Sequence, residues 1–335
     1  MSGNTTATAS RPARRAVQVS ELVERAQAGE ARAVARLISL VENESPLLRE
    51  IAAALAPHVG HAQIVGLTGS PGVGKSTTTA ALIASLRADE QRVGVLAVDP
   101  SSPFSGGALL GDRVRMQDHA TDDGVFIRSM ATRGHLGGLT AAAPQALRVL
   151  DAAGCDVVLI ETVGVGQAEV EIASLADTTM VLLAPGMGDG IQAAKAGILE
   201  VADIFIVNKA DRDGADAVAR DLRGMQSLGG RHTEQGAWRP PIVKTVASRG
   251  EGMDDVRAAI GKHRAWLQRS GELQRRRVVR ASAEIEALAV AALRQQFAEL
   301  HGSVALGALA ERVVNGDLDP FQAADELVEA ATEQV

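Results

Sequence analysis

The middle of the chain alternates short apolar runs with longer stretches of helical periodicity, from Gln63 to about Leu267. Nearly continuous β-branched runs are typical of strands covered on both faces, and their alternation with helices is typical of βαβ units. The pattern therefore predicts an α/β fold in which a mostly parallel sheet is flanked by helices. The expected strands are residues 64–68, 93–98, 125–129, 157–160, 178–183, 204–207 and 242–246.

The pattern before the sheet predicts two helices. Ser20 is placed to cap a helix that runs toward Asn43, because a serine hydroxyl accepts from amides that lack a partner in the first turn. Ser45-Pro46 repeats the start signal, since proline fits the first helical position. Apolar residues follow both signals at helical spacing, so we expect a helical segment at 20–60, after a disordered tail at 1–19.

After the sheet, helical periodicity returns. An apolar stripe crosses residues 285–297, and Asp319-Pro320 marks the start of a last helix. These helices either pack on a core of their own or pack against a second subunit. We expect the α/β domain at residues 61–270 and a helical dimerisation arm at residues 271–335.

Composition and charge narrow the classes of partner. The hydrophobic content of 46% is enough to bury a core, and 41 acidic against 34 basic residues give a net charge of −7 without a long basic block, which disfavours nucleic-acid binding. The sequence contains neither an apolar segment of membrane-spanning length nor a signal-peptide core. We therefore expect no nucleic acid or membrane partner and a cytoplasmic location. The mitochondrial matrix would follow only if the basic tail is a transit peptide.

The single cysteine, Cys155, lies in an apolar run, where a small buried thiol is favoured over a reactive one. One cysteine can form no internal disulfide and cannot supply a Cys-x-x-Cys zinc site. A reducing compartment therefore fits this sequence, and a thiolate metal centre does not.

The first expected strand is followed at once by a phosphate-binding motif. It fits G-x-x-x-x-G-K-[ST] at every fixed position and precedes a helix-compatible run that starts at Thr77. In such a loop, backbone amides surround phosphate oxygens, Lys75 neutralises charge on the β- and γ-phosphates, and the Ser76 hydroxyl reaches Mg²⁺. The alternative is a glycine-rich turn without a ligand. The motif reads Gly69-Ser70-Pro71-Gly72-Val73-Gly74-Lys75-Ser76.

A carboxylate follows the expected strand at 157–160. Glu161 opens the string Glu161-Thr162-Val163-Gly164, which places an acid at the carboxyl end of a strand, where open α/β sheets bind ligands. There Glu161 can hold the water shell of Mg²⁺, and the Gly164 amide can approach the γ-phosphate. The string is informative because it lies downstream of the phosphate loop.

A second acid, Asp99, comes directly after the expected strand at 93–98 and opens a loop rich in Ser, Pro and Gly. Its carboxylate could reach Mg²⁺, and the loop composition suits a segment that reorders with nucleotide state. Asp112, beside Arg113, is a further candidate metal ligand. The alternative for both acids is a plain loop capped by Asp99.

The expected strand at 204–207 is followed by Asn208-Lys209-Ala210-Asp211. The Asp211 carboxylate can accept from both the ring N–H and the exocyclic amine of guanine, whereas adenine presents an acceptor where guanine presents a donor. Asn208 would tie this loop to the phosphate loop, and the Lys209 stem would cover the base. The alternative is a helix cap with a solvated lysine. Further along, the stretch Ala247-Ser248-Arg249 is placed to meet the base with a backbone amide.

The hydrolysis machinery is incomplete in the sequence. Small GTPases carry a water-orienting glutamine beside the glycine of the D-x-x-G motif, but here Val165 follows Gly164 and the nearest glutamine is Gln167. We therefore expect slow GTP hydrolysis that a partner accelerates. Lys195 or Arg113 could supply the stimulating charge, and the alternative for Lys195 is a solvated helix residue.

Taken together, the motifs resemble those of the methylmalonyl-CoA mutase-associated GTPases, the MeaB-type chaperones. The resemblance covers nearly the whole chain, including the helical flanks, and the combination is more specific than any single motif. It rests on the phosphate loop, the base loop and three segments between them, residues 69–76, 99–103, 110–116, 161–167 and 208–211.

The resemblance implies a homodimeric GTPase with a P-loop GTPase core that uses GTP and Mg²⁺ and carries glutamate, here Glu161, where most GTPases carry aspartate. It implies binding to adenosylcobalamin-dependent methylmalonyl-CoA mutase or a related acyl-CoA mutase, whose cofactor loading the GTPase gates and which it protects or reactivates. Residues 185–195 resemble a switch segment that responds to the mutase. The implied catalytic residues are Lys75, Glu161 and Lys195.

Two other functions stay open. A nickel-insertion GTPase of the same superfamily would normally carry Cys/His metal-binding elements, whereas this chain has one cysteine and seven scattered histidines. A transport-associated kinase would transfer phosphate from ATP to an acceptor, which conflicts with the guanine interpretation of Asp211.

Overall fold

The structure, a computed structural model, describes residues 18–100, 119, 121–132, 142–162, 168–186, 200–228, 236–300 and 304–332. The chain divides into two compact units, Met1–Leu273 and Gln274–Val335. The first contains the sheet and the helices packed on it, and the second contains helices alone.

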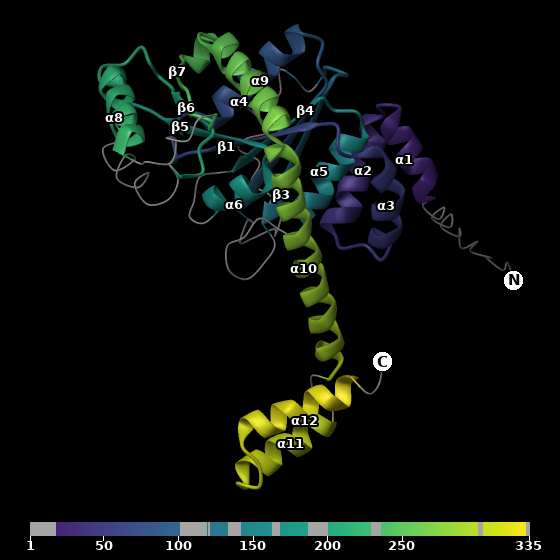
Figure 1. Cartoon of the computed structure of the whole chain (residues 1–335). Coiled ribbons are helices and arrows are strands. Elements are labelled where there is room, and N and C mark those ends of the chain that lie inside the picture. The colour runs from purple at the N-terminus through teal and green to yellow at the C-terminus, as the bar shows by residue number, and fades with distance from the viewer. Residues whose placement is uncertain are drawn as a thin grey trace, which may run out of the picture. The chain divides into compact units, whose positions relative to one another are not determined.

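A seven-stranded sheet forms the centre of the first unit in the described residues (Figure 1). Every strand pairs in parallel with its neighbours, in the order β3-β2-β4-β1-β5-β6-β7. The parallel sheet expected from the apolar runs is confirmed. The strands are β1 (Gln63–Thr68), β2 (Val93–Pro100), β3 (Val125–Thr132), β4 (Val157–Thr162), β5 (Thr178–Leu183), β6 (Ile204–Val207) and β7 (Ile242–Lys244).

Helices cover both faces of this sheet, because alternate residues of each strand face opposite sides. In β2, Val93 and Val95 pack into the cluster that contains α4 (Lys75–Ala88) and α9 (Met253–Ser270), whereas Leu96 and Val98 pack into the opposite cluster. On that opposite side lie α5, α6 and α8. The result is a three-layer α/β arrangement. The three helices span Ala142–Ala152, Ala168–Leu175 and Ala215–Leu228.

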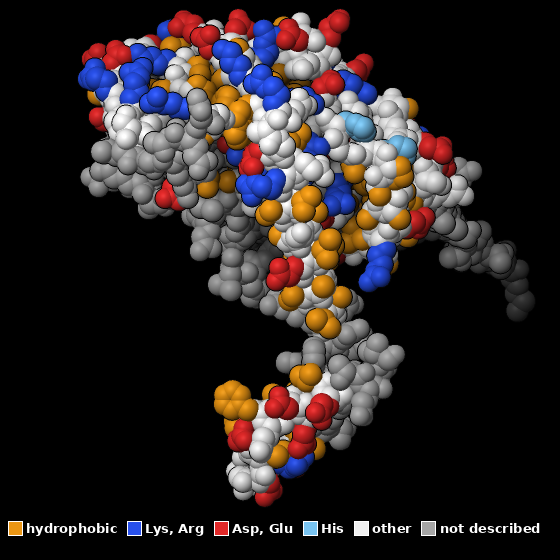
Figure 2. Space-filling view, viewed as in Figure 1, with side chains coloured by type: hydrophobic (Ala, Val, Ile, Leu, Met, Phe, Trp, Pro, Cys, Tyr) orange, Lys and Arg blue, Asp and Glu red, His pale blue; other side chains and the backbone are white. Residues whose placement is uncertain are grey.

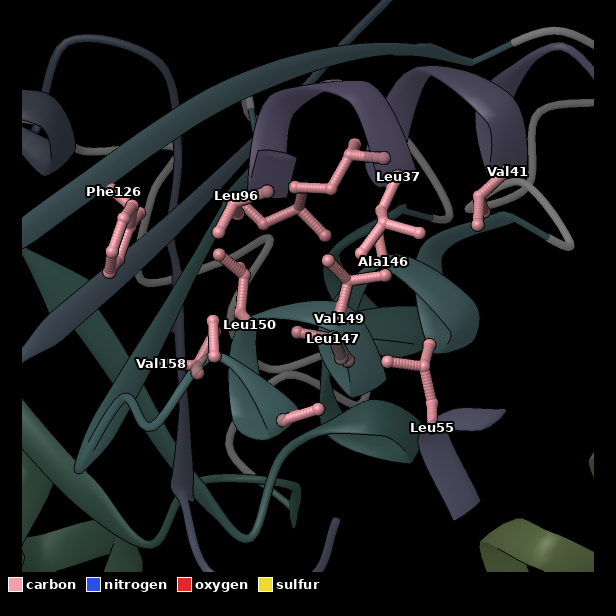
Figure 3. Packing of buried hydrophobic residues seen from close by; sticks show 14 of the residues in the cluster. Leu37, Val41, Leu55, Leu96, Phe126, Ala146, Leu147, Val149, Leu150 and Val158 are labelled. Carbon is pink, nitrogen blue, oxygen red and sulfur yellow. The ribbon is translucent and has the colours of Figure 1, made fainter. Parts of the chain in front are cut away.

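The helices before the sheet share the core of the α/β layers. Leu37 of α2 and Leu55 of α3 are fully buried and belong to one cluster with Leu96 of β2 and Leu150 of α5 (Figure 3). Burying each such side chain contributes about 1.5–3 kcal/mol, so this segment is bound firmly to the sheet. It consists of α1 (Val19–Gln27), α2 (Ala31–Glu42), α3 (Leu48–Leu55) and a 3₁₀ turn, η1 (Ala56–His58).

The prediction of one helix from Ser20 toward Asn43 is wrong. Two helices occupy this stretch, and Ser20 lies inside α1, whose N-cap is Gln18. The chain turns at Gly29, whose φ of 84° lies in the left-handed region that favours glycine, and Glu30 N donates to Arg25 O at 3.0 Å. This hydrogen bond is typical of a helix C-terminus, so the backbone conformation at Gly29 ends α1.

The two tryptophans of the chain lie beside one buried histidine. His263 of α9 is buried, with Nδ1 2.9 Å from Thr178 Oγ1, and its ring lies 4.7 Å from the Trp238 ring and 5.7 Å from the Trp266 ring. Trp238 Nε1 donates to Asp203 O at 2.8 Å. This aromatic group therefore joins α9 to the amino ends of β5 and β6.

The second unit exposes apolar side chains. The large hydrophobic residues that are exposed in the described part of the chain all lie between Val278 and Val328, and Phe321 is 84% exposed. Figure 2 shows such side chains along α10. Apolar patches of this kind mark interaction surfaces. The helices are α10 (Glu272–Leu300), α11 (Val304–Val314) and α12 (Pro320–Thr332).

The start of the last helix follows the sequence signal. Asp319 Oδ1 accepts from Phe321 N at 2.7 Å and from Gln322 N at 3.0 Å, as a helix cap does. Arg312 Nη1 donates to Glu326 Oε2 at 2.6 Å and so links α11 to α12. The helix start expected at Asp319-Pro320 is confirmed. Among the helices of the described segments, none combines the length and apolar character needed to cross a membrane.

Cys155 is expected to be unreactive in the folded protein. The residue is 2% exposed, and burial raises the pKa of its thiol to about 12, so the nucleophilic thiolate is scarce near neutral pH. A maleimide or a disulfide reagent at pH 8 should leave the native protein unlabelled and should modify one thiol per chain in denaturant, as measured by intact-mass spectrometry. Fast stoichiometric labelling of the native protein would contradict the burial.

Candidate functional site

The phosphate loop runs from the end of β1 to the start of α4, and its glycines are required by close packing. Gly69 has a φ of 141°, and a Cβ there would lie 2.4 Å from Leu182 O. Gly74, the N-cap of α4, has a φ of 98°, and a Cβ there would lie 2.5 Å from Asn208 Nδ2. Any larger residue would push the loop away from its neighbours, so glycine fixes its course at both ends.

Lys75 lies at the first position of α4 and turns back over the loop. Its Nζ donates to Gly69 O at 2.7 Å and to Ser70 O at 3.3 Å, and the residue is buried. The ammonium group is thereby held at the amino end of a helix, where the partial positive charge also favours anions. This arrangement suits a polyphosphate.

Glu161 lies near the end of β4 and faces the start of α4. The residue is 3% exposed; Oε1 accepts from Ser76 Oγ at 2.6 Å and Oε2 accepts from Thr79 Oγ1 at 2.7 Å. Parallel pairing of β1 with β4 sets Leu67 opposite Glu161, and this register brings the acid beside the phosphate loop. A hydroxyl and a carboxylate so close together are hard oxygen ligands of the type that Mg²⁺ binds, and Mg²⁺ needs only one or two such protein groups.

Asn208, directly after β6, joins three loops. Its Nδ2 donates to Val73 O at 2.9 Å, and its Oδ1 accepts from Thr245 Oγ1 and from Ala247 N, both at 3.1 Å. The side chain is buried, so these hydrogen bonds are formed away from water. The phosphate loop and the loop after β7 are therefore held in fixed positions around one amide group.

Lys209 and Asp211 lie beside this junction. Lys209 adopts the left-handed backbone conformation, with a φ of 56°, and its Nζ donates to Gly72 O at 2.7 Å. Such backbone conformations in residues other than glycine concentrate at functional sites. The Asp211 carboxylate lies 3.5 Å from Arg249 Nη1, and both side chains are exposed. An accepting carboxylate is thus presented at the surface next to a lysine stem.

The stretch 247–249 forms a short 3₁₀ helix, η4, beside Asp211. Ala247 N donates to Asn208 Oδ1 and Arg249 N donates to Val246 O at 2.9 Å. Because these two amides are engaged within the protein, Ser248 is the residue of the three whose amide is the candidate for meeting a base. The hydrogen bond to Glu251 and the charge of Asp211 raise the pKa of the Arg249 guanidinium, which stays charged.

Several residues singled out in the sequence lie outside the described residues, namely Asp112, Arg113, Gly164, Val165, Gln167 and Lys195. Asp99 lies on β2, but its side chain is not among those described. Pro71 lies in the described loop, between Gly69 and Gly72, and Thr77 lies in the first turn of α4.

Two hydroxyl residues of the site were missed in the sequence. Thr79 reaches Glu161 from α4, and Thr245 reaches Asn208 from the end of β7. Thr79 follows Ser76 by three positions, which places both on one side of a helix, so its part in the site could have been found. Nothing in the local sequence around Thr245 marks it.

The parallel sheet, the phosphate loop after β1 and the base loop after β6 define the class of P-loop nucleotide hydrolases. The chain belongs to the family described as the methylmalonyl-CoA mutase-associated GTPase MeaB, whose model matches residues 34–301. It is therefore a GTPase, and the resemblance noted in the sequence is confirmed.

Individual relatives agree with this membership. A Pyrococcus abyssi protein that bears the name of a GTPase is 49% identical over 310 residues, which cover 92% of this chain and 95% of the relative. The mitochondrial methylmalonic aciduria type A homolog of Mus musculus is 34% identical over 321 residues, with 90% and 77% coverage. A crystal structure described as a LAO/AO transport system kinase matches with a TM-score of 0.68 at 28% identity, covering 94% of this chain and 97% of that one.

Proposed function

We propose that the protein is a GTP-hydrolysing chaperone that binds an adenosylcobalamin-dependent acyl-CoA mutase and gates loading of its cofactor. Methylmalonyl-CoA mutase is the client that we favour. The observation that carries this proposal is the family match across residues 34–301, whose description names that mutase. The name of the mouse relative refers to methylmalonic aciduria and supports the same client.

In this proposal the phosphate loop binds GTP and GDP. Residues 69–77 surround the phosphates with backbone amides, and Lys75 neutralises charge on the β- and γ-phosphates. Ser76 would bind Mg²⁺ and Glu161 its water shell, with Asp99 and Asp112 as further candidate ligands. Bound Mg²⁺ would neutralise charge on the phosphate oxygens. The short distance between Ser76 Oγ and Glu161 Oε1, 2.6 Å, supports this pairing.

The base pocket is proposed to form between Asn208 and η4. Asp211 would accept two hydrogen bonds from guanine, and the Lys209 stem would cover the ring. Asn208 holds both sides of this pocket together through its hydrogen bonds to Val73 O and Ala247 N. Support for guanine over adenine comes from the acceptor-only chemistry of the Asp211 carboxylate.

Hydrolysis is proposed to be slow until the client binds. Lys75, Glu161 and the Gly164 amide would position the phosphates, and Lys195 is the candidate for the charge that client binding brings to the site. A charge supplied in this way accelerates related enzymes by roughly 10³–10⁵.

The second unit is proposed to be a dimerisation arm. Ile285, Leu288 and Leu293 of α10 are each more than half exposed, which is costly for side chains of this size in water. A second copy of the chain would cover them. Light scattering after gel filtration should report a dimer, and Ile285→Glu combined with Leu288→Glu should yield a monomer that keeps its GTPase activity.

The test of the proposed function is phosphate release from GTP and from ATP, with and without purified methylmalonyl-CoA mutase. We expect GTP-selective hydrolysis that native mutase accelerates and that heat-denatured mutase does not. GTP selectivity without a response to the mutase would refute this client and keep the nucleotide site. A preference for ATP, with label transferred to an acceptor, would refute the chaperone and favour a kinase.

A further inference from the structure

Glu161 is held at both oxygens from a single helix. Ser76 Oγ lies 2.6 Å from Oε1, and Thr79 Oγ1 lies 2.7 Å from Oε2. All three residues are buried, and the two donors are one helical turn apart on α4. We propose that Thr79 is a positioning residue for Mg²⁺ binding by this GTPase. Its hydrogen bond fixes the Glu161 carboxylate so that the carboxylate can order the water shell of Mg²⁺. This inference rests on the proposed role of Glu161.

The Thr79 hydroxyl has two acceptors within reach but only one hydrogen. It lies 3.1 Å from Lys75 O, the ordinary partner of a threonine in a helix, and 2.7 Å from Glu161 Oε2. A hydrogen bond to an ionised acceptor is shorter and stronger than one to a neutral carbonyl. The hydroxyl therefore donates to the carboxylate, and the contact with the helix backbone is secondary.

The two hydroxyl donors are not equivalent. Ser76 is the proposed ligand of the metal, so its oxygen is committed to Mg²⁺ whenever the nucleotide is bound. Thr79 is not a proposed metal ligand, so its hydrogen bond can hold Glu161 in the same place with and without metal. A glutamate side chain also has one more rotatable bond than an aspartate, and the additional freedom must be removed for the carboxylate to act at a fixed point. A second anchor at Oε2 does this.

Thr78 provides a matched control on the same helix. It is also fully buried, and its Oγ1 donates to Gly74 O at 2.9 Å, the same bond to the fourth preceding carbonyl that Thr79 can form with Lys75. The hydrogen bonds of its hydroxyl do not include Glu161. Replacing either threonine with valine therefore removes one buried hydroxyl from α4, and only Thr79→Val removes a hydrogen bond to the acid.

The experiment titrates Mg²⁺ against binding of a fluorescent, non-hydrolysable GTP analogue to the full-length protein. Thr79→Val should raise the half-saturating Mg²⁺ concentration about tenfold, because groups that orient metal-binding side chains typically change metal affinity by 10–100-fold. Thr78→Val and Thr79→Ser should stay within about twofold of the wild type, and analogue binding in EDTA should be equal in all four proteins. Melting temperatures without nucleotide check the fold.

A Mg²⁺ requirement for Thr79→Val equal to that of Thr78→Val would overturn the inference, as would failure of Thr79→Ser to restore the wild-type value. If valine disturbs the packing of α4, Thr79→Ala removes the same hydroxyl without added bulk and is compared with Thr78→Ala. If guanine-nucleotide binding by the wild-type protein did not depend on Mg²⁺, the proposed role of Glu161 would be refuted instead. Failure of the Thr79 inference and failure of the Glu161 role are therefore distinguishable.

Discussion

Asp211→Asn is expected to weaken binding of GDP and GTP by about 10²-fold or more, because a site built to hydrogen-bond a particular group rejects a mismatched one strongly. The carboxylate accepts at both oxygens, whereas asparagine would point a donor at the N–H groups of guanine. Xanthine carries a carbonyl in place of the exocyclic amine, so the same variant should gain affinity for xanthosine diphosphate. Equilibrium titration with fluorescent nucleotides measures both changes.

Asp216→Asn is the matched control for this prediction. Asp216 lies on α8, pairs with the ammonium group of Lys244 at the surface and takes no part in the proposed base pocket. Exposed pairs of this kind contribute at most about 1 kcal/mol, so nucleotide preference should not change. Equal guanine affinity in Asp211→Asn and Asp216→Asn would disprove the assignment of the base pocket.

Lys75→Ala is expected to lower kcat for GTP by roughly 10²–10³, the usual cost of deleting one group that stabilises developing charge. Nucleotide affinity should fall as well, because the lysine holds a positive charge at the phosphate loop, with Nζ 2.7 Å from Gly69 O. The effect should persist at saturating GTP, which separates it from a loss of affinity alone. Phosphate release under steady-state conditions measures kcat and KM together.

The control for Lys75→Ala is Lys262→Ala, which removes a lysine that is exposed on α9. It should hydrolyse GTP at the wild-type rate. Since Lys75 also donates to the loop backbone, a melting curve without nucleotide must show that the variant is folded. If a folded Lys75→Ala protein retained wild-type kcat, this lysine would have no role in hydrolysis.

The sheet could be predicted from the sequence because its strands are buried on both faces. Such strands are uniformly apolar, and short runs such as Ile204–Val207 stand out between helical stretches. The phosphate loop could be predicted for a different reason: its glycines are required by the close approach of other chain segments, since a Cβ at Gly69 or Gly74 would clash with Leu182 or Asn208. Structural constraints that act on neighbouring residues can therefore be recognised in the local sequence.

The remaining features depend on distant parts of the chain. Thr79 and Glu161 are 82 positions apart, and their contact exists only because β4 pairs with β1 in one register. Asn208 and Val73 are 135 positions apart. Gly29 itself is a local signal for the end of a helix. The apolar stripe, however, continues through both helices onto the same core, and this continuity favoured the prediction of a single helix. Periodicity reports which face is buried and is insensitive to a turn that preserves that face.

The aromatic group around His263 allows the unfolding of the two units to be followed by different spectroscopic signals. The chain has two tryptophans and no tyrosine, and both indoles lie in the first unit, with ring centres 5.9 Å apart. Indole emission during unfolding therefore reports on Met1–Leu273 alone, while helical circular dichroism reports on both units. Where the two curves separate, the difference belongs to Gln274–Val335. The wild-type protein thus needs no added label to distinguish loss of the GTPase unit from loss of the helical unit.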